Sequence, residues 1–302
     1  MNSPLPTTAS MSMSMSTRAD STGDLLRGRT AVVTGASRGI GRAIAIRFAA
    51  EGANVAMIAR TQEPHPKLPG TIHTAAADAA AAGGDVLPLV ADVRDDKALA
   101  EAVDRIVERF GGIDILVNNA GSVDLTGAEQ IGMRRYDHMQ AVNVRAPFLL
   151  SKLALPYLRI SAQAGRNPHI LALSPPLNMS PEHVGNGVAY TVSKYGVSIA
   201  TIGLAHEFRS YGIAVNSLWP RTKIDTAAVR NLLGGEEAVA ASRTPFICAD
   251  AAVLIVTSPA SAYTGQLLLD EDVLASRGSI DLDRYRVVPG AGALANDLFV
   301  DG

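Results

Sequence analysis

Short apolar runs alternate with longer alanine-rich segments along most of this chain, and this alternation constrains the fold more than any other feature. The runs are rich in β-branched residues and lack polar alternation, which is typical of strands buried on both faces of a sheet. The segments between them are long enough for crossover helices. The seven runs are TAVVTG, ANVAMIAR, DVLPLVAD, DILVNNAG, PHILALS, IAVNSLWP and GQLLLD. The pattern predicts the α/β class, with a single doubly wound Rossmann domain, a seven-stranded parallel sheet and helices on both faces.

The two ends of the chain depart from this pattern. Residues 1–26, which include MSMSMS, show no apolar period and are predicted to form a disordered leader. Residues 27–270 carry the alternating runs and are predicted to form one domain. Residues 271–302 are acidic and are expected to form an extension that packs on that domain.

The composition excludes several classes of protein. A formal net charge of -2 gives no basic surface for nucleic acid or for an anionic membrane. Cys248 is the only cysteine, so neither an internal disulfide nor a cysteine-based zinc site can form. The histidines lack metal-ligand spacing, and no apolar run reaches the roughly 18 residues that span a bilayer. We therefore expect a cytoplasmic protein with no catalytic metal, no nucleic-acid partner and no membrane span.

A glycine-rich turn follows the first apolar run. In TGASRGIGRAIAIRF, Gly35, Gly39 and Gly41 lie between a predicted strand and a predicted helix. Glycine here permits close approach of the backbone to a pyrophosphate, which binds at the positive N-terminus of the helix. Because the turn follows the first strand of a βαβ unit, a dinucleotide site is favoured over a purely structural turn. Ser37 and Ile40 belong to the same predicted site.

Arginine stands where an acidic residue would indicate NAD. The second apolar run ends at Arg60, and Arg38 lies inside the glycine-rich turn. A guanidinium suits the 2′-phosphate of NADP(H), whereas a carboxylate would repel it. We therefore predict NADP(H) as the cofactor, with two solvated surface arginines as the alternative.

Tyr190 and Lys194 are spaced four residues apart in AYTVSKYG, on one face of a predicted helix. A neighbouring ammonium favours the phenolate, so we expect the pKa of Tyr190 to lie below its usual value of about 10. The phenol could then exchange a proton with a substrate oxygen.

Together these motifs resemble the short-chain dehydrogenase/reductase family. TGASRGIG, NNAG at 118–121, Asn143 in AVNVRAPF, and Tyr190 with Lys194 occur in the order and spacing of that family, over residues 28 to about 270. Other stretches, among them HILALSPPLN and IAVNSLWPRT, resemble a branch associated with lipid metabolism. The resemblance implies that the domain at 27–270 binds NADP(H) and contains the catalytic site.

The resemblance also implies roles for individual residues. Tyr190 would exchange the proton with the substrate, and Lys194 would contact the nicotinamide ribose and tune Tyr190. Asn143 would hold the water of a proton relay, or would only cap or pin a helix. Glycine is usual in the family where this chain has Arg221. The other implied cofactor contacts are Asp92 at the adenine, Val93, Asn119, Ala120, Gly121, Pro220 and Thr222.

The usual catalytic hydroxyl is missing from its expected position. Alignment of HILALS with the family places Pro175 where the catalytic serine is normally found, and proline cannot donate a hydrogen bond. Three possibilities remain: Ser174 turns toward Tyr190, Asn178 or Ser180 donates from the following loop, or Tyr190 acts without a second donor.

Two functions are compatible with these features. The first is an NADP(H)-dependent oxidoreductase that interconverts a carbonyl and a secondary alcohol, on an apolar or lipid-derived small molecule. The second is an NADP(H)-binding protein with little turnover that acts as a sensor or partner-binding module. The apolar stripe in VSIATIGLAHEF suits a homodimer or homotetramer as well as a core helix.

Overall fold

The computed structural model describes residues 23–301 except 66–67, 279 and 291. Residues 1–22, most of the segment predicted to be a disordered leader, lie outside the described residues. Leu26 also belongs to that segment, but it is fully buried, and its backbone N–H donates to the carbonyl of Glu51 at 2.9 Å. The folded domain therefore includes residues before the predicted boundary at 27.

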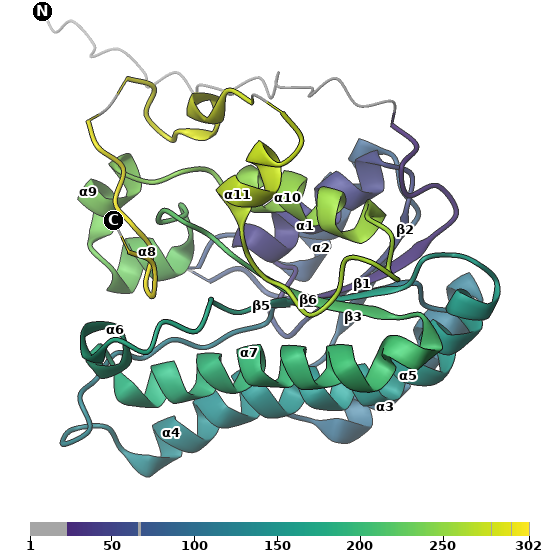
Figure 1. The fold of residues 1–302 in the computed structure, drawn as a ribbon, viewed down its shortest axis with the longest axis horizontal. Helices are drawn as coiled ribbons and strands as arrows, with labels where there is room; N and C mark the ends of the chain where they lie inside the picture. The colour runs from purple at the N-terminus through teal and green to yellow at the C-terminus, as the bar shows by residue number, and fades with distance from the viewer. Residues whose placement is uncertain (1–22, 66–67, 279, 291, 302) are drawn as a thin grey trace, which may run out of the picture.

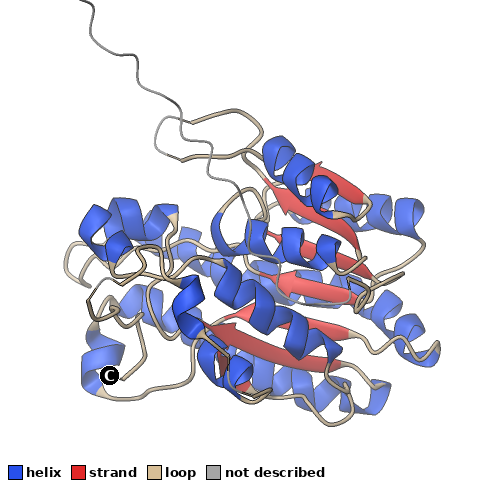
Figure 2. Ribbon diagram, turned by 90° about the horizontal axis from the view of Figure 1, so that it is seen from above, coloured by secondary structure: helices blue, strands red, loops and turns tan. Residues whose placement is uncertain are grey.

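All seven predicted runs form strands of one parallel sheet (Figure 2). The strand order is β3-β2-β1-β4-β5-β6-β7, so the chain begins near the centre and winds outward in both directions. This confirms the predicted doubly wound domain, and it places a topological switch point between β1 and β4. The strands are β1 (Thr30–Thr34), β2 (Asn54–Ala59), β3 (Val86–Val90), β4 (Ile115–Asn118), β5 (His169–Leu173), β6 (Ala214–Trp219) and β7 (Leu267–Leu269).

Helices cover both faces of the sheet (Figure 1). One core cluster packs α1 (Gly39–Ala50), α2 (Ile72–Ala82), α10 (Phe246–Thr257) and α11 (Asp270–Ala275) against the first face. A second cluster packs α3 (Asp96–Phe110), α5 (Ala146–Gln163) and α7 (Val188–Phe208) against the other face. The remaining helical elements are α4 (Met133–Gln140), the π-helical turn Ala141–Arg145, α6 (Pro181–Gly185), α8 (Ala227–Leu232), α9 (Gly235–Ala240) and the short 3-10 helices Arg209–Tyr211 and Leu282–Tyr285.

Near its end the chain crosses the loop that follows β6, and we call residues 295–301 the C-terminal strap. The backbone N–H of Lys223 donates to the carbonyl of Ala295 at 2.8 Å, and that of Asp297 donates to the carbonyl of Arg221 at 3.0 Å. The indole N–H of Trp219 donates to the carbonyl of Leu298 at 2.9 Å. These bonds attach the strap to the carboxyl end of β6, where ligands bind in doubly wound folds.

Candidate active site

A cavity of about 420 Å³ opens at the carboxyl ends of the parallel strands. Ligand sites of doubly wound folds lie at this edge, beside the switch point. Residues just after β1, β2, β3, β4 and β6 and at the end of β5 line it together. The sequence-predicted residues on its wall are Gly35, Ser37, Arg38, Gly39, Ile40, Arg60, Asp92, Val93, Asn119, Ala120, Gly121, Tyr190, Lys194 and Pro220.

The glycine-rich turn is shaped by contacts that leave no room for side chains. Gly35 has φ +64°, and a Cβ on it would lie 2.8 Å from the Cα of Ala120. A Cβ on Gly41 would lie 2.3 Å from Nδ2 of Asn119. That amide donates to the carbonyls of Thr34 at 2.8 Å and Gly35 at 3.2 Å, which fixes the turn. Gly41 therefore supports the turn from behind and is not itself on the cavity wall.

The first turn of α1 is available to an anion. Arg38 occupies the N-cap position in extended conformation, and it makes no side-chain cap. The first N–H groups of an uncapped helix lack intrahelical partners and carry the positive end of the helix dipole. Gly39 and Ile40, which begin the helix, line the cavity. The arrangement fits a pyrophosphate at this end of the cavity.

Two guanidinium groups lie close together on the cavity wall. Arg38 donates to the carbonyls of Pro69 at 3.2 Å and Gly70 at 3.1 Å. Burial lowers the pKa of Arg38, and the neighbouring charge of Arg60 lowers it further. Arg60 is exposed at the end of β2. Two guanidinium groups on one wall favour an anionic group of a ligand there.

Asp92 is already engaged by a neighbouring arginine. Nη2 of Arg94 donates to Oδ2 of Asp92 at 2.6 Å, and Nε donates to Oδ1 at 3.0 Å. These bonds lower the pKa of the Asp92 carboxyl to about 2, so it is ionised at neutral pH. The carboxylate remains on the cavity wall with Val93.

Tyr190 and Lys194 project from α7 into the same cavity, and both are buried. Nζ of Lys194 donates to the carbonyl of Leu173 at 2.7 Å and lies 5.1 Å from the centre of the Trp219 ring. Burial lowers the pKa of Lys194 to about 8, although the charge of Asp297 opposes this shift.

The pKa of Tyr190 shifts in the direction opposite to our expectation. Burial raises it well above its usual value, and the negative charge of Asp297 raises it further. Desolvation of the phenolate and the charge of Asp297 set this direction, and neither can be inferred from the spacing of Tyr190 and Lys194 in the sequence. The phenol is therefore protonated at neutral pH and suits a proton donor.

Asn143 is a bracing residue in the structure. It lies in the π-helical turn Ala141–Arg145, and π-turns frequently occur at functional sites. Its Oδ1 accepts from the N–H of Ser122 at 2.8 Å, and its Nδ2 donates to the carbonyl of Ser122 and to Oγ of Ser193, each at 2.9 Å. Asn143 therefore pins the chain after β4, and its side chain is not on the cavity wall.

The structure does not bring Ser174 to the cavity. The residue is fully buried, its Oγ has no hydrogen-bond partner among the described residues, and the cavity wall passes through Leu173 instead. Thr222 is likewise buried, with its hydroxyl unpartnered within the described chain, and it is not on the wall.

The Asn178 side chain is turned to other partners, one of them the backbone N–H of Ser180. Nδ2 of Asn178 donates to Oδ2 of Asp301 at 3.0 Å, and Oδ1 accepts from the N–H of Ser180 at 3.1 Å. Neither residue lines the cavity. Ser174, Asn178 and Ser180 were the candidates for the hydroxyl that is missing because residue 175 is proline. None of the three lines the cavity that contains Tyr190.

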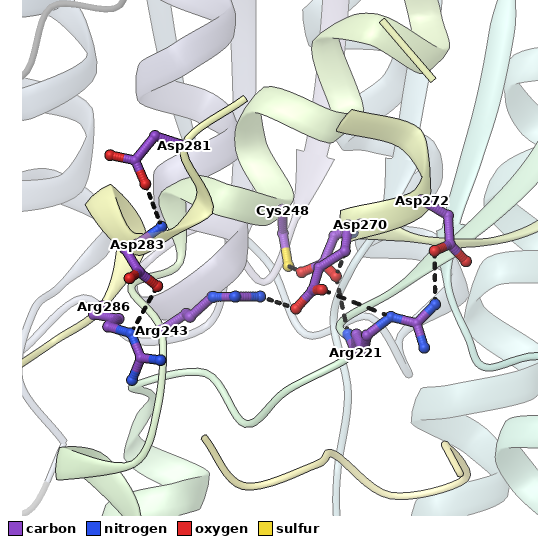
Figure 3. A network of polar contacts seen from close by, with 9 residues as sticks. Arg221, Arg243, Cys248, Asp270, Asp272, Asp281, Asp283 and Arg286 are labelled. Carbon is purple, nitrogen blue, oxygen red and sulfur yellow. Dashed lines mark hydrogen bonds and ion pairs between the residues drawn. The ribbon is translucent and has the colours of Figure 1, made fainter. Parts of the chain in front are cut away.

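Arg221 stands where glycine is usual in the family that the motifs resemble. It forms hydrogen bonds with residues of α11 (Figure 3). Its N–H donates to Oδ1 of Asp270 at 2.9 Å, and its Nη2 donates to Oδ1 of Asp272 at 2.6 Å. Burial raises the pKa of Asp270 to about 6. The backbone of Arg221 does not have positive φ, so arginine fits without strain. The network fixes the loop after β6 against the domain.

Comparison with known proteins decides the family. The short chain dehydrogenase model matches residues 29–236. The chain belongs to the short-chain dehydrogenase/reductase family. It is 52% identical over 277 residues to hydroxysteroid dehydrogenase-like protein 2 of Danio rerio. The matched region covers 92% of this chain but only 65% of the Danio rerio protein. The chain thus spans less than two thirds of that relative's length.

Solved structures agree with this short-chain dehydrogenase assignment. A short chain dehydrogenase from Mycobacterium thermoresistibile is 50% identical, with a TM-score of 0.84 over 91% of this chain and 96% of that one. A metagenomic short-chain oxidoreductase solved in complex with NADP is 29% identical, with a TM-score of 0.66 over 82% of this chain and 98% of that one. The resemblance inferred from the motifs is confirmed.

The site of this short-chain dehydrogenase also contains residues that the sequence motifs did not single out. Asp297 and Leu298 reach the cavity from the C-terminal strap, and Ser122 and Trp219 reach it from the ends of β4 and β6. Burial raises the pKa of Asp297 to about 7, and the charge of Asp270 adds to the shift. The sequence showed only that residues 271–302 are acidic. It could not identify Asp297 as the carboxylate that lines the cavity.

Among the described residues, no group of three or more histidine, cysteine, aspartate or glutamate side chains is placed to hold a metal ion. No helix in the described part of the chain is both long and apolar enough to cross a membrane.

Proposed function

We propose that this protein is an NADP(H)-dependent oxidoreductase that interconverts a carbonyl and a secondary alcohol, on an apolar or lipid-derived substrate. One observation carries the proposal: a single cavity contains both the glycine-rich turn and the Tyr190-Lys194 pair. A dinucleotide bound along this cavity would place its reactive end beside a proton-donating phenol.

The residues present fit a dinucleotide with a third phosphate. The uncapped start of α1 and the close backbone at Gly35 suit the pyrophosphate. Arg38 and Arg60 offer two guanidinium groups to a 2′-phosphate. When bound, the nicotinamide supplies or accepts the hydride at the substrate carbon.

The chain's own contribution is the handling of the proton. In reduction, Tyr190 donates its phenolic proton to the substrate oxygen, and in oxidation it takes a proton back. The Lys194 ammonium, fixed by the carbonyl of Leu173, provides positive charge near the phenol. This charge stabilises the phenolate that forms when Tyr190 gives up its proton.

The nature of the substrate is supported by the cavity wall and by the relatives. Apolar side chains line much of the cavity, among them Val123, Leu233 and Leu298. Apolar walls with few polar groups favour an apolar ligand. The name of the Danio rerio relative, hydroxysteroid dehydrogenase-like protein 2, points to the same class of alcohol and ketone.

NADPH oxidation with a panel of ketones, aldehydes and ketoacyl thioesters tests the proposal. We expect turnover with at least one apolar carbonyl. Because no hydroxyl from residues 174–176 lies on the cavity wall, an NADP(H)-binding module with little turnover is the second candidate. Tight NADPH binding without turnover on any substrate would favour that candidate.

The cofactor preference depends on Arg60. Replacing it by alanine is expected to weaken NADPH binding by about 10- to 100-fold, because a hydrogen bond to a charged group contributes about 1.5–3 kcal/mol. NADH affinity, measured by the same fluorescence titration, should change little. Arg109→Ala, which removes a guanidinium paired with Asp85 outside the cavity, is the control. Wild-type protein that binds NADH as tightly as NADPH would contradict the preference.

We also propose a homodimer or homotetramer formed through α7. Val192, Ile199 and Ile202 on this helix are 47%, 60% and 45% exposed, which leaves an apolar stripe uncovered in the single chain. Ile199→Asp is expected to shift the mass measured by light scattering toward the monomer, because a charge in an apolar interface is costly. An unchanged mass would place the interface elsewhere.

A further inference from the structure

The C-terminal strap is fixed on both sides of the cavity. On one side, Asp297 and Ala295 pair with the backbone of the loop after β6, at Arg221 and Lys223. On the other side, Asp301 accepts from Nδ2 of Asn178 at 3.0 Å and lies 2.9 Å from Nε2 of His183. The strap is therefore part of the wall.

Phe299 anchors the middle of the strap on the catalytic helix. It is 3% exposed, and its ring centre lies 6.0 Å from that of Tyr190 and 5.3 Å from that of Tyr195. Its φ of +71° is rare for a large side chain and is maintained only where the surroundings fix it. The packing of Phe299 thus sets the position of Asp297, two residues earlier.

The Asp297 carboxyl has one oxygen engaged within the strap. Oδ1 accepts from the N–H of Leu298 at 2.7 Å. Oδ2 has no hydrogen-bond partner among the described residues, and the residue lines the cavity with Tyr190 and Lys194. Its charge is close enough to shift the pKa of both. Asp297 therefore has one carboxyl oxygen without a partner among the described residues, on the same cavity wall as Tyr190 and Lys194.

We propose that Asp297, in its protonated form, donates a hydrogen bond to the reacting oxygen of the substrate beside Tyr190, in place of the hydroxyl absent at Pro175. The role rests on the proposed carbonyl reduction. Ser174, Asn178 and Ser180 do not reach the cavity, whereas Asp297 does. The second donor thus comes from the C-terminus and not from the end of β5.

The proton balance of the step leaves Asp297 unchanged. In reduction the substrate carbon receives the hydride, the electron pair of the C=O π bond moves to oxygen, and that oxygen takes the proton of Tyr190. Asp297 keeps its proton and stabilises the negative charge that develops on the oxygen. Its ionised form would repel that charge, so only the acid can serve.

The surroundings of Asp297 keep the acid form accessible near neutral pH. Burial raises its pKa to about 7, and the charge of Asp270 on α11 acts in the same direction. Lys223 in the loop after β6 and Lys194 on α7 lower the pKa. Tyr190, also on α7, stays neutral because its pKa is raised. The donor is therefore present below about pH 7 and is lost as the pH rises through that value.

Two substitutions of Asp297 separate a donor from a structural role. Asp297→Ala removes the donor and is expected to lower kcat/KM for carbonyl reduction by about 100-fold or more. Asp297→Asn keeps a hydrogen-bond donor, because its Oδ1 can accept from the N–H of Leu298 while its NH₂ group faces the cavity. We expect kcat/KM of this variant to fall by less than about 10-fold. The wild-type rate should fall above about pH 7, and this fall should be absent in Asp297→Asn. The decline from Lys194, near pH 8 in the wild type, should remain in Asp297→Asn but at lower pH, because the charge of Asp297 raises the pKa of Lys194.

Melting temperature and NADPH affinity, measured for each variant, show whether the fold and the cofactor site persist. Asp301→Asn changes a strap carboxylate outside the cavity and is the matched control. Ser122→Ala removes a hydroxyl that also lies on the cavity wall, and a loss as large as that in Asp297→Ala would assign the donor to Ser122 and overturn the proposal. Activity of Asp297→Ala within about threefold of wild type, equal losses in the two Asp297 variants, or an unchanged pH profile in Asp297→Asn would overturn the proposal. Absence of turnover in the wild-type protein would instead refute the proposed function, and the role of Asp297 with it.

Discussion

Tyr190→Phe is expected to lower kcat/KM for carbonyl reduction by about 10²- to 10⁴-fold, the range that a positioned general acid contributes. The hydroxyl has no hydrogen-bond partner among the described residues, and it belongs to a side chain on the cavity wall. Phenylalanine keeps the ring that stacks on Phe299, so the C-terminal strap should stay in place. The loss should therefore appear in kcat, with NADPH affinity and melting temperature close to those of the wild type.

A second tyrosine on the same helix provides the control. Tyr195 also packs on Phe299, but its hydroxyl donates to the carbonyl of Asn178, outside the cavity. Tyr195→Phe should therefore keep kcat within a few-fold of the wild type, at most with a modest loss of stability. If the two variants lose activity alike, Tyr190 acts through packing and not as the proton donor.

The fold could be predicted because each of its determinants is local in the sequence. Runs such as TAVVTG and HILALS show their burial in a few residues, and turn glycines separate them from helix-length segments. The residues proposed to bind the cofactor could be predicted for the same reason. Gly35 and Arg60 come directly after a strand and Asp92 two residues after one, and parallel strands end at one edge of a sheet.

The direction of side chains near the substrate could not be predicted in the same way. Whether the Ser174 hydroxyl reaches the cavity depends on how the chain turns after β5, and the structure places the residue in the interior. The shifted pKa of Tyr190 depends on the depth of its burial, which the spacing to Lys194 does not reveal. Asn143 matched a family position, but only the structure shows that its amide is used to hold Ser122.

Asp297 was beyond sequence reasoning for a different reason. It is separated from Tyr190 by two strands and several helices, and no motif connects the two positions. Its place in the cavity arises from the packing of Phe299 and from the backbone pairing of the C-terminal strap with the loop after β6. A contact made by the last residues of a chain depends on the completed domain, so it carries no local signature.

The glycine-rich turn is the most constrained element of the site, and Gly41 is its tightest point. A Cβ there would lie 2.3 Å from Nδ2 of Asn119 and 2.6 Å from the carbonyl oxygen of Gly35. The oxygen belongs to the backbone, and the amide is held by the carbonyls of Thr34 and Gly35. Neither can move without breaking hydrogen bonds that shape the turn.

Gly41→Ala is therefore expected to reduce the free energy of unfolding by about 2–4 kcal/mol, the range for overpacking combined with a broken hydrogen-bond network. NADPH affinity should fall by at least about 10-fold, because the displaced turn no longer aligns the N–H groups of α1 with the pyrophosphate. Gly112→Ala is the matched control, since Gly112 has ordinary φ and nothing within 4 Å of an added Cβ. Denaturant titration and cofactor fluorescence measure the two effects. If Gly41→Ala binds NADPH as tightly as Gly112→Ala, the turn bounded by Asn119 is not the pyrophosphate site.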